Sequence, residues 1–389
     1  MNTTTLLTKP FSWTKLGTKS GGSQKTYLFG PRLDFLGLGG LSLLVILFFG
    51  LVPEPELIKP QVAMLFFIAT QFINHPHFAH SYQIFYRDFG RKIGEQTGPE
   101  LRYRYWFAGI IAPLVIGLYY SFALWNGDTR LIGYSINVMG FLVGWHYVKQ
   151  GYGMLSVQSV LQRKFFTDGE KKLLLYNAYA GWAYSWVFGN RLFAEKDFWG
   201  VGYYTFGVPD SVHMLTLGIM VVMTTLTLIM FVRRMLPGGN GLPLIGVMAY
   251  LTSIYIWRIV LEINPLYAFA IPAFHSLQYL VVVWRFQLNV ETENVENGAT
   301  TRLSYWIPQA AIARLVRFYV IGLLLGALAF WGVPALLTLT MDEASAASGF
   351  FWPFAVVWVF INVHHYLLDN VMWRKGNPDV SKHLFNHTA

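Results

Sequence analysis

Long apolar runs recur along most of the chain, and short segments between them carry most of the charged residues. About 20 apolar residues in a helix are enough to cross the hydrocarbon core of a bilayer. The pattern therefore predicts an all-α protein, a polytopic transmembrane helix bundle of about ten helices. The predicted helices cover residues 33–53, 57–86, 105–126, 131–161, 171–190, 211–233, 243–261, 266–285, 308–337 and 349–373.

The basic residues fall unevenly on the two sides of this predicted bundle. Of the 29 Lys and Arg, 23 lie in the alternate set of connections that includes both chain ends, and four lie in the other set. Because Lys and Arg favour cytoplasmic loops, both termini are predicted to be cytoplasmic. We expect a cytoplasmic N-terminal tail at 1–32, a transmembrane domain at 33–375 and a cytoplasmic C-terminal tail at 376–389, in an inner or plasma membrane.

Composition agrees with the membrane interpretation and limits the chemistry. Hydrophobic residues make up 54% of the chain, and charged residues make up only 13%. The net charge of +9 follows from the topology and from attraction to anionic lipid, so it predicts no nucleic-acid partner. The chain has no cysteine, which excludes disulfides and thiolate sites and leaves nitrogen and oxygen ligands.

Three segments share one spacing: 77–87, 275–285 and 364–374 each begin with a histidine and end with an arginine that follows an aromatic residue. Ten helical residues rise about 15 Å, which is roughly half the hydrocarbon thickness of a bilayer. With the arginines at the headgroup level, the histidines would lie near the membrane midplane. An ionisable residue at that depth is rare and predicts a functional site.

Histidines at this depth occur on four predicted helices that all run from outside to inside. Parallel helices can bring side chains of equal depth together, and buried imidazoles need partners, which a metal ion or a heme supplies. The predicted metal ligands are His75, His77, His80, His146, His275, His364 and His365.

Three residues near these histidines are candidates for catalysis. Asp369 lies four residues after His365 on one helix face, as a ligand or as a carboxylate that orients the ring. Tyr279 would donate a hydrogen bond or carry a radical, with packing as the alternative. Lys149 would line the pocket, pair with an acid or extend towards the interface.

Five residues are candidates for substrate binding. Each of the three repeated arginines predicts a headgroup anchor, or together they predict a ring that holds an anionic lipid or substrate head at the inner leaflet. Two glutamines lie beside the histidines on the same predicted helices. The set is Arg87, Arg285, Arg374, Gln150 and Gln278.

A ligand set of nitrogen and oxygen favours non-heme iron, as one or two ions, with zinc, copper and manganese as alternatives. Two ions would suit five or more histidines with a carboxylate. Heme b is a separate alternative, because two opposed histidines on different helices are sufficient to bind it.

The motifs NHPHFAHSY, WHYVKQGYG, FHSLQY and VHHYLLDNVMWR resemble those of polytopic non-heme iron membrane enzymes. The nearest resemblance is to the Brp/Blh-like carotene dioxygenases, followed by the lipid desaturase and hydroxylase group, although the HxxHH-type boxes of desaturases are absent. The resemblance implies O2-dependent chemistry on a lipid-soluble substrate that enters from the bilayer. We therefore expect a membrane oxidoreductase of lipid metabolism, an oxygenase, hydroxylase or desaturase, with an electron-donor protein as partner.

Two other classes of function remain open at this stage. The first is a proton- or ion-coupled transporter whose histidines relay protons or coordinate the transported ion. The repeated segments on similarly directed helices fit the internal repeats of such proteins. The second is a subunit of a larger membrane complex that holds heme or pigment.

Overall fold

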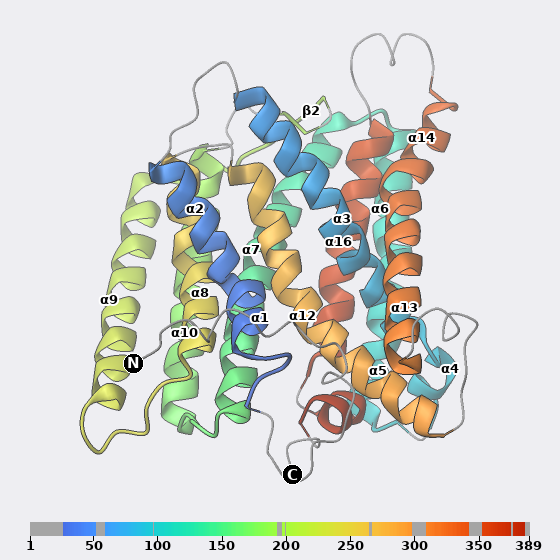
Figure 1. Cartoon of the computed structure of the whole chain (residues 1–389). Coiled ribbons are helices and arrows are strands. Elements are labelled where there is room, and N and C mark those ends of the chain that lie inside the picture. The colour runs from blue at the N-terminus through green and yellow to red at the C-terminus, as the bar shows by residue number, and fades with distance from the viewer. Residues whose placement is uncertain are drawn as a thin grey trace.

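The structure is a computed structural model, and it describes residues 26–51, 59–95, 97–192, 197–198, 200–263, 267–297, 309–341, 352–374 and 376–385. In these residues the chain forms helices that stand side by side in a bundle (Figure 1). The first elements are α1 (Pro31–Phe35), η2 (Leu36–Gly40), α2 (Leu41–Leu51), α3 (Lys59–Tyr86), α4 (Phe89–Lys92), α5 (Pro99–Trp106), η4 (Phe107–Ile111), α6 (Ala112–Trp125), α7 (Thr129–Leu161) and α8 (Asp168–Leu192).

The second half of the chain continues this all-helical pattern after one short hairpin. Strands β1 (Asp197–Phe198) and β2 (Val201–Gly202) pair antiparallel. The helices that follow are α9 (Asp210–Met235), α10 (Leu244–Leu251), η5 (Thr252–Ile256), α11 (Trp257–Ile263), α12 (Tyr267–Glu296), α13 (Ala310–Ala327), η7 (Leu328–Gly332), α14 (Val333–Thr338), α16 (Trp352–Met372), α17 (Pro378–Val380) and η8 (Ser381–Phe385).

Six helical segments among the described residues are long and apolar enough to cross a membrane. They are Pro31–Phe48, Pro99–Trp125, Thr129–Leu161, Asp210–Met235, Leu244–Leu261 and Ala310–Thr338. Their outward faces expose large apolar side chains, such as Leu118 on α6 and Leu215 on α9. A lipid environment covers such faces, so the chain has the character of a membrane protein.

Helices α3, α8, α12 and α16 lie outside this set of six, and three of them carry histidine motifs. Helix α12 also extends further than its predicted end at 285, because it continues to Glu296. The polar stretch stays helical since Gln287 donates to Glu291 at 2.6 Å, and Arg314 of α13 pairs with the same carboxylate. The change from apolar to charged residues therefore predicted an end for this helix that is 11 residues too early.

Helix α3 packs closely against α13, which lies at the edge of the bundle (Figure 1). Gly322 and Gly326 of α13 are four residues apart and face α3. A Cβ atom on Gly326 would lie 2.4 Å from the carbonyl oxygen of His75, and one on Gly322 would lie 2.5 Å from the ring of His80. Small residues at this spacing allow membrane helices to approach closely.

Wider π turns, η2, η4, η5 and η7, interrupt four of the long helices. A π turn shifts the backbone hydrogen-bond pattern and leaves carbonyl groups for other donors. Gln278 donates to the Leu38 carbonyl oxygen of η2 at 2.8 Å, and His364 donates to the Ala108 carbonyl oxygen of η4 at 2.9 Å. These two residues therefore join neighbouring helices.

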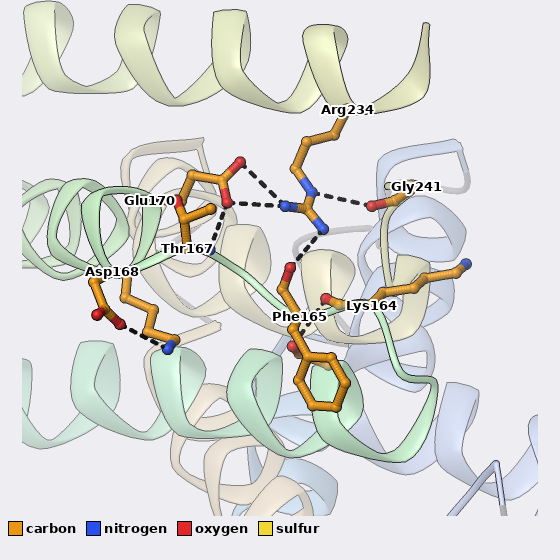
Figure 2. Close-up of polar contacts among 9 residues, drawn as sticks. Lys164, Phe165, Thr167, Asp168, Glu170, Arg234 and Gly241 are labelled. Carbon is orange, nitrogen blue, oxygen red and sulfur yellow. Dashed lines mark hydrogen bonds and ion pairs between the residues drawn. The ribbon is translucent and has the colours of Figure 1, made fainter. Parts of the chain in front are cut away.

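A buried arginine fixes two connections at the same end of α8 and α9 (Figure 2). Arg234 of α9 contacts both carboxylate oxygens of Glu170, at 3.1 and 2.9 Å. It also donates to the carbonyl oxygens of Phe165 and Gly241, at 3.0 and 3.1 Å. The guanidinium group thus uses all three of its nitrogens, as a buried charge requires.

We call the end of the bundle that carries α4 and residues 376–385 the inner end (Figure 1). Helices α17 and η8 lie there and pack on α12. Asn289 donates to the carbonyl oxygen of His383 at 2.7 Å, and the ring of Phe286 contacts the His383 ring. Val380 and Leu384 are buried in the same core. The predicted C-terminal tail is therefore structured as far as residue 385.

Candidate metal centre

Four histidine side chains from four helices meet in the interior of the bundle. His77 comes from α3, His146 from α7, His275 from α12 and His365 from α16, and all four are buried. The ring centroids of His365 lie 4.5 Å from His77 and 5.1 Å from His146. The ring centroid of His275 lies 5.2 Å from that of His77 and 4.9 Å from that of His146. We call these residues the four-ring cluster.

The spacing of these rings matches the spacing around one metal ion. With a metal–nitrogen bond of about 2.1 Å, each centroid lies roughly 3.2 Å from the ion, so adjacent rings are about 4.6 Å apart and opposite rings about 6.5 Å. His77 and His146, which face each other across the cluster, are 6.3 Å apart. One ring nitrogen from each of His77, His146 and His365 lies within 4.8 Å of the other two, so these three residues could hold a metal ion. His275 adjoins them through its ring contacts with His77 and His146.

A carboxylate oxygen of Asp369 lies beside the four-ring cluster. It lies one turn after His365 on α16, and its Oδ2 is 3.4 Å from Nε2 of His365 and 3.8 Å from Nε2 of His146. Its other oxygen, Oδ1, accepts hydrogen bonds from Ser81 at 2.8 Å and from Tyr279 at 3.1 Å. One carboxylate oxygen is thus held by protein hydroxyls while the other faces the imidazoles.

Ser81 is the one member of this arrangement that the sequence analysis missed. Its hydroxyl lies 2.6 Å from the Tyr279 hydroxyl as well as contacting Asp369. The available signal was its position four residues after His77, which places both side chains on one face of a helix. Because serine is neither charged nor a histidine, the patterns of histidines and charges do not single it out.

Most polar atoms of the cluster have no hydrogen-bond partner within the described part of the chain. Both ring nitrogens of His77, His275 and His365, Nε2 of His146 and Oδ2 of Asp369 are buried without a protein hydrogen bond. Burying a polar atom without a partner costs free energy, and native proteins rarely do so. A metal ion satisfies nitrogen and oxygen donors together, so the donor set fits a metal.

Aromatic side chains surround the cluster and separate it from solvent. Tyr147 stacks on His275 with centroids 3.9 Å apart. Phe78 meets His365 edge to face at 4.6 Å, Tyr366 lies 4.7 Å from His146, and Tyr279 lies 4.3 Å from His77. A charge in such surroundings interacts more strongly with its neighbours than it does in water.

The structure does not bring His364 or His80 into the four-ring cluster. Both ring nitrogens of His364 are engaged elsewhere, Nδ1 with the hydroxyl of Tyr82 at 3.0 Å and Nε2 with a backbone carbonyl of η4 at 2.9 Å. The ring of His80 contacts Gln83 at 2.7 Å and Trp284 at 3.4 Å. Both rings are therefore satisfied by protein groups.

His75 also lies apart from the cluster. Its Nε2 accepts a hydrogen bond from the indole of Trp331 at 3.2 Å, and its ring stacks on Phe330. Both partners belong to η7, so this histidine connects α3 to the neighbouring helix. Of the seven predicted ligands, four lie in the four-ring cluster and three contact neighbouring helices.

The predicted substrate-binding glutamines contact protein groups instead. Gln150 donates to the backbone carbonyl oxygen of His275 at 2.9 Å and to Oε1 of Gln278 at 3.2 Å. The same Oε1 accepts from Ser253 at 3.2 Å. These amides support the backbone of α12 beside the cluster.

The predicted arginines lie nearer the inner end. Arg87 donates to Gln287 of α12 at 2.7 Å, and Arg285 is buried. Arg374 and Lys149 are half-buried and interact electrostatically with each other. Lys149, proposed above as a catalytic residue, therefore has a cationic neighbour at the inner end of α16.

The comparisons with known proteins add no further constraint on this site. No protein-family model, no curated protein and no solved structure matches the chain. The interpretation of the site therefore depends on the geometry of its own residues.

Proposed function

We propose that His77, His146, His275 and His365, together with Asp369, bind one non-heme iron ion inside the helix bundle. On this proposal the protein is an integral membrane oxidoreductase that uses O2 to oxidise a lipid-soluble substrate. The observation that carries the proposal is the group of four buried imidazoles beside one oriented carboxylate oxygen. Seven of their eight ring nitrogens have no hydrogen-bond partner among the described residues.

The choice of metal follows from the number and kind of donors. Four imidazole nitrogens and one carboxylate oxygen leave one position of an octahedral ion for O2 or substrate, which suits iron better than the tetrahedral preference of zinc. Adjacent rings 4.5 to 5.2 Å apart leave no room for a porphyrin between them. The spacing therefore favours a single ion over heme and over two separate ions.

Iron held by these residues would supply the one-electron chemistry that activates O2. A hydroxylation that inserts one oxygen atom into the substrate and reduces the other to water needs two electrons from an electron-donor protein and two protons from the medium. A dioxygenation that places both atoms in products needs no external electrons. The aromatic shell of Phe78, Tyr147 and Tyr366 supports either reaction, because it keeps water from the reacting groups.

We further propose that all ten long helical segments cross the membrane and that both termini are cytoplasmic. Helix α3 has 28 residues and α12 has 30, so each is about 40 Å long and long enough to span a bilayer. Their lower apolar content is explained by the polar groups of the site, which face the bundle interior. The basic residues support the orientation, with an inner or plasma membrane as the location.

Metal analysis of single-residue variants tests the proposed ligands. His365→Gln and His77→Gln should lose most of the bound iron, because each removes a donor from the four-ring cluster. His364→Gln is the matched control, since His364 is the next residue on α16 but contacts Tyr82 and η4. The measurement is iron per chain in detergent-purified protein, with the ultraviolet-visible spectrum to detect any heme.

The expected result is about one iron per wild-type chain, no Soret band, and retention of iron in His364→Gln. Wild-type protein that stays free of metal after reconstitution would contradict the proposal. Equal loss of iron in His364→Gln and His365→Gln would also contradict it, since only one of these rings faces the cluster.

A further inference from the structure

Tyr279 of α12 connects the four-ring cluster with Asp369. Its ring lies 4.3 Å from the ring of His77, centroid to centroid. Its hydroxyl donates to Oδ1 of Asp369 at 3.1 Å and lies 2.6 Å from the hydroxyl of Ser81, which itself donates to the same oxygen. The phenol therefore has a proton acceptor within hydrogen-bond distance and a proposed metal ligand in ring contact.

This combination matters because a phenol that loses one electron becomes a strong acid. The oxidation is favourable only where a base takes the proton as the electron leaves, and a hydrogen-bonded carboxylate is such a base. Tyr366 is a second buried tyrosine in contact with the cluster and lies on the same helix as Asp369, but it donates to the amide oxygen of Asn362 at 2.9 Å instead. An amide oxygen is a poor proton acceptor, so the two tyrosines differ in this property.

A second aromatic residue extends this arrangement towards the inner end. The indole of Trp373 lies 5.8 Å from the Tyr279 ring, edge to face, directly after α16. Trp373 is half-buried, whereas Tyr279 is buried. The order His77, Tyr279, Trp373 therefore leads from the cluster to a residue that is partly exposed at the inner end.

We propose that Tyr279 is a proton-coupled electron donor to the metal centre and that Trp373 conducts the electron that restores it. This inference rests on the proposed iron site. With iron bound and oxidised by O2, the O–H bond of Tyr279 would break, its proton would pass to Oδ1 of Asp369, and its electron would pass to the metal. In the return step an electron from the donor protein passes through Trp373 and reduces the phenoxyl radical, which takes its proton back from Asp369.

The experiment is rapid freezing of the iron-loaded, reduced protein at set times after mixing with O2, followed by electron paramagnetic resonance. Wild type should show a tyrosyl radical signal, identified by its change when the protein contains ring-deuterated tyrosine. Tyr279→Phe should lose the signal while keeping its iron. Tyr366→Phe is the matched control and should keep both.

Trp373→Phe tests the return step. With an external electron donor present, the radical signal in this variant should last several-fold longer than in wild type, because reduction of Tyr279 is slowed. Trp125→Phe is the control, since Trp125 is 92% exposed at the end of α6 and should not change the lifetime.

The outcomes separate the two proposals. Wild-type protein that binds no metal overturns the proposed function and this inference with it. Iron-loaded protein that shows no tyrosyl radical at any time, or that keeps the signal in Tyr279→Phe, overturns this inference and leaves the iron site standing.

Discussion

Asp369 contacts two different kinds of group at the centre of this bundle. Its Oδ2 faces the imidazoles of His146 and His365, and its Oδ1 accepts hydrogen bonds from Ser81 and Tyr279. Groups that hydrogen-bond a metal-ligating carboxylate fix its direction and affect the affinity for the metal. Ser81 should therefore act as a positioning residue for the proposed iron site.

Removing the Ser81 hydroxyl should weaken metal binding without abolishing it. We expect Ser81→Ala to lower iron affinity by about 10- to 100-fold, the usual effect of losing such a supporting hydrogen bond. Competition with a chelator measures this affinity. Ser276→Ala is the control, because Ser276 is equally buried but donates to Asn74. Similar losses of affinity in both variants would show that any buried serine supports the site only through folding.

Sequence reasoning predicted that histidines from four helices share one level of the bundle, but it could not predict the direction of each ring. His364 and His365 are adjacent, yet one contacts η4 and the other the four-ring cluster. Successive helical residues point about 100° apart, so only one of two neighbours can face a given partner. Which one does so depends on how α16 is rotated against its neighbours, and the sequence of α16 does not encode that rotation.

Lys92, at the inner end, makes a pH-dependent contribution to the free energy of unfolding. Its ammonium group donates to the carbonyl oxygens of Ile84 and Phe85, at 2.7 and 3.0 Å, and so caps α3. Burial lowers the pKa of Lys92 from 10.5 to about 8. Between these two pH values the unfolded chain binds more protons than the folded protein, so the free energy of unfolding should rise as the pH increases from 8 to 10.5.

The comparison of wild type with Lys92→Met isolates this contribution. Between pH 8 and 10.5, Lys92 should raise the free energy of unfolding of the wild type by on the order of 3 kcal/mol at most, and the variant should lack this increase. Denaturant unfolding in detergent at several pH values gives, for each protein, the slope of the free energy of unfolding against pH. All other titrating groups are common to both proteins. Parallel slopes would mean that Lys92 titrates in the folded protein as it does in the unfolded chain.

At the scale of elements, the contact between α3 and α13 holds the first histidine motif in place. His75 lies on α3 two residues before the cluster residue His77, and its backbone contacts Gly326 of α13. No larger residue fits there without moving one helix away from the other. The position of His77 therefore depends on a glycine that has no polar group of its own.

Gly326→Ala should destabilise the protein because the added Cβ would meet the His75 backbone at 2.4 Å. Overpacking of this kind costs about 1–3 kcal/mol. Thermal unfolding in detergent should show a lower midpoint for Gly326→Ala. Gly117→Ala on α6 is the control, because a Cβ there meets nothing within 4 Å. An unchanged midpoint for Gly326→Ala would show that α3 and α13 separate easily.

Hydrophobic patterning located the helices well because long apolar runs and charged connections alternate strongly. It failed where the helix end is set by tertiary contacts, as at Glu291 and Arg314, which keep α12 helical past residue 285. It also could not predict the π turns such as η4, because a single widened turn changes the periodicity too little. That turn presents the Ala108 carbonyl oxygen to His364, whose ring donates to it and lies outside the cluster.

At the scale of the whole molecule, three of the four helices that carry the four-ring cluster, α3, α12 and α16, lie outside the six most apolar segments. Helices α3, α12 and α16 each contribute histidine, while the six most apolar segments include α7 and the outer helices of the bundle. Polar groups are tolerated inside a membrane where protein surrounds them. The polar groups of the site thus account for the lower apolar content of α3, α12 and α16, whereas α8 contributes no residue to the site.

The absence of cysteine from the chain makes this topology directly testable. Single cysteines at exposed positions can be labelled in intact cells with a maleimide that does not cross membranes. We expect Asn126→Cys and Thr340→Cys to be labelled from outside, and Lys172→Cys and Asn297→Cys to be labelled only after permeabilisation. The chain without introduced cysteine is the control. Because Asn297 and Thr340 flank the helix formed by α13, η7 and α14, labelling of both from one side would mean that this helix does not cross the membrane.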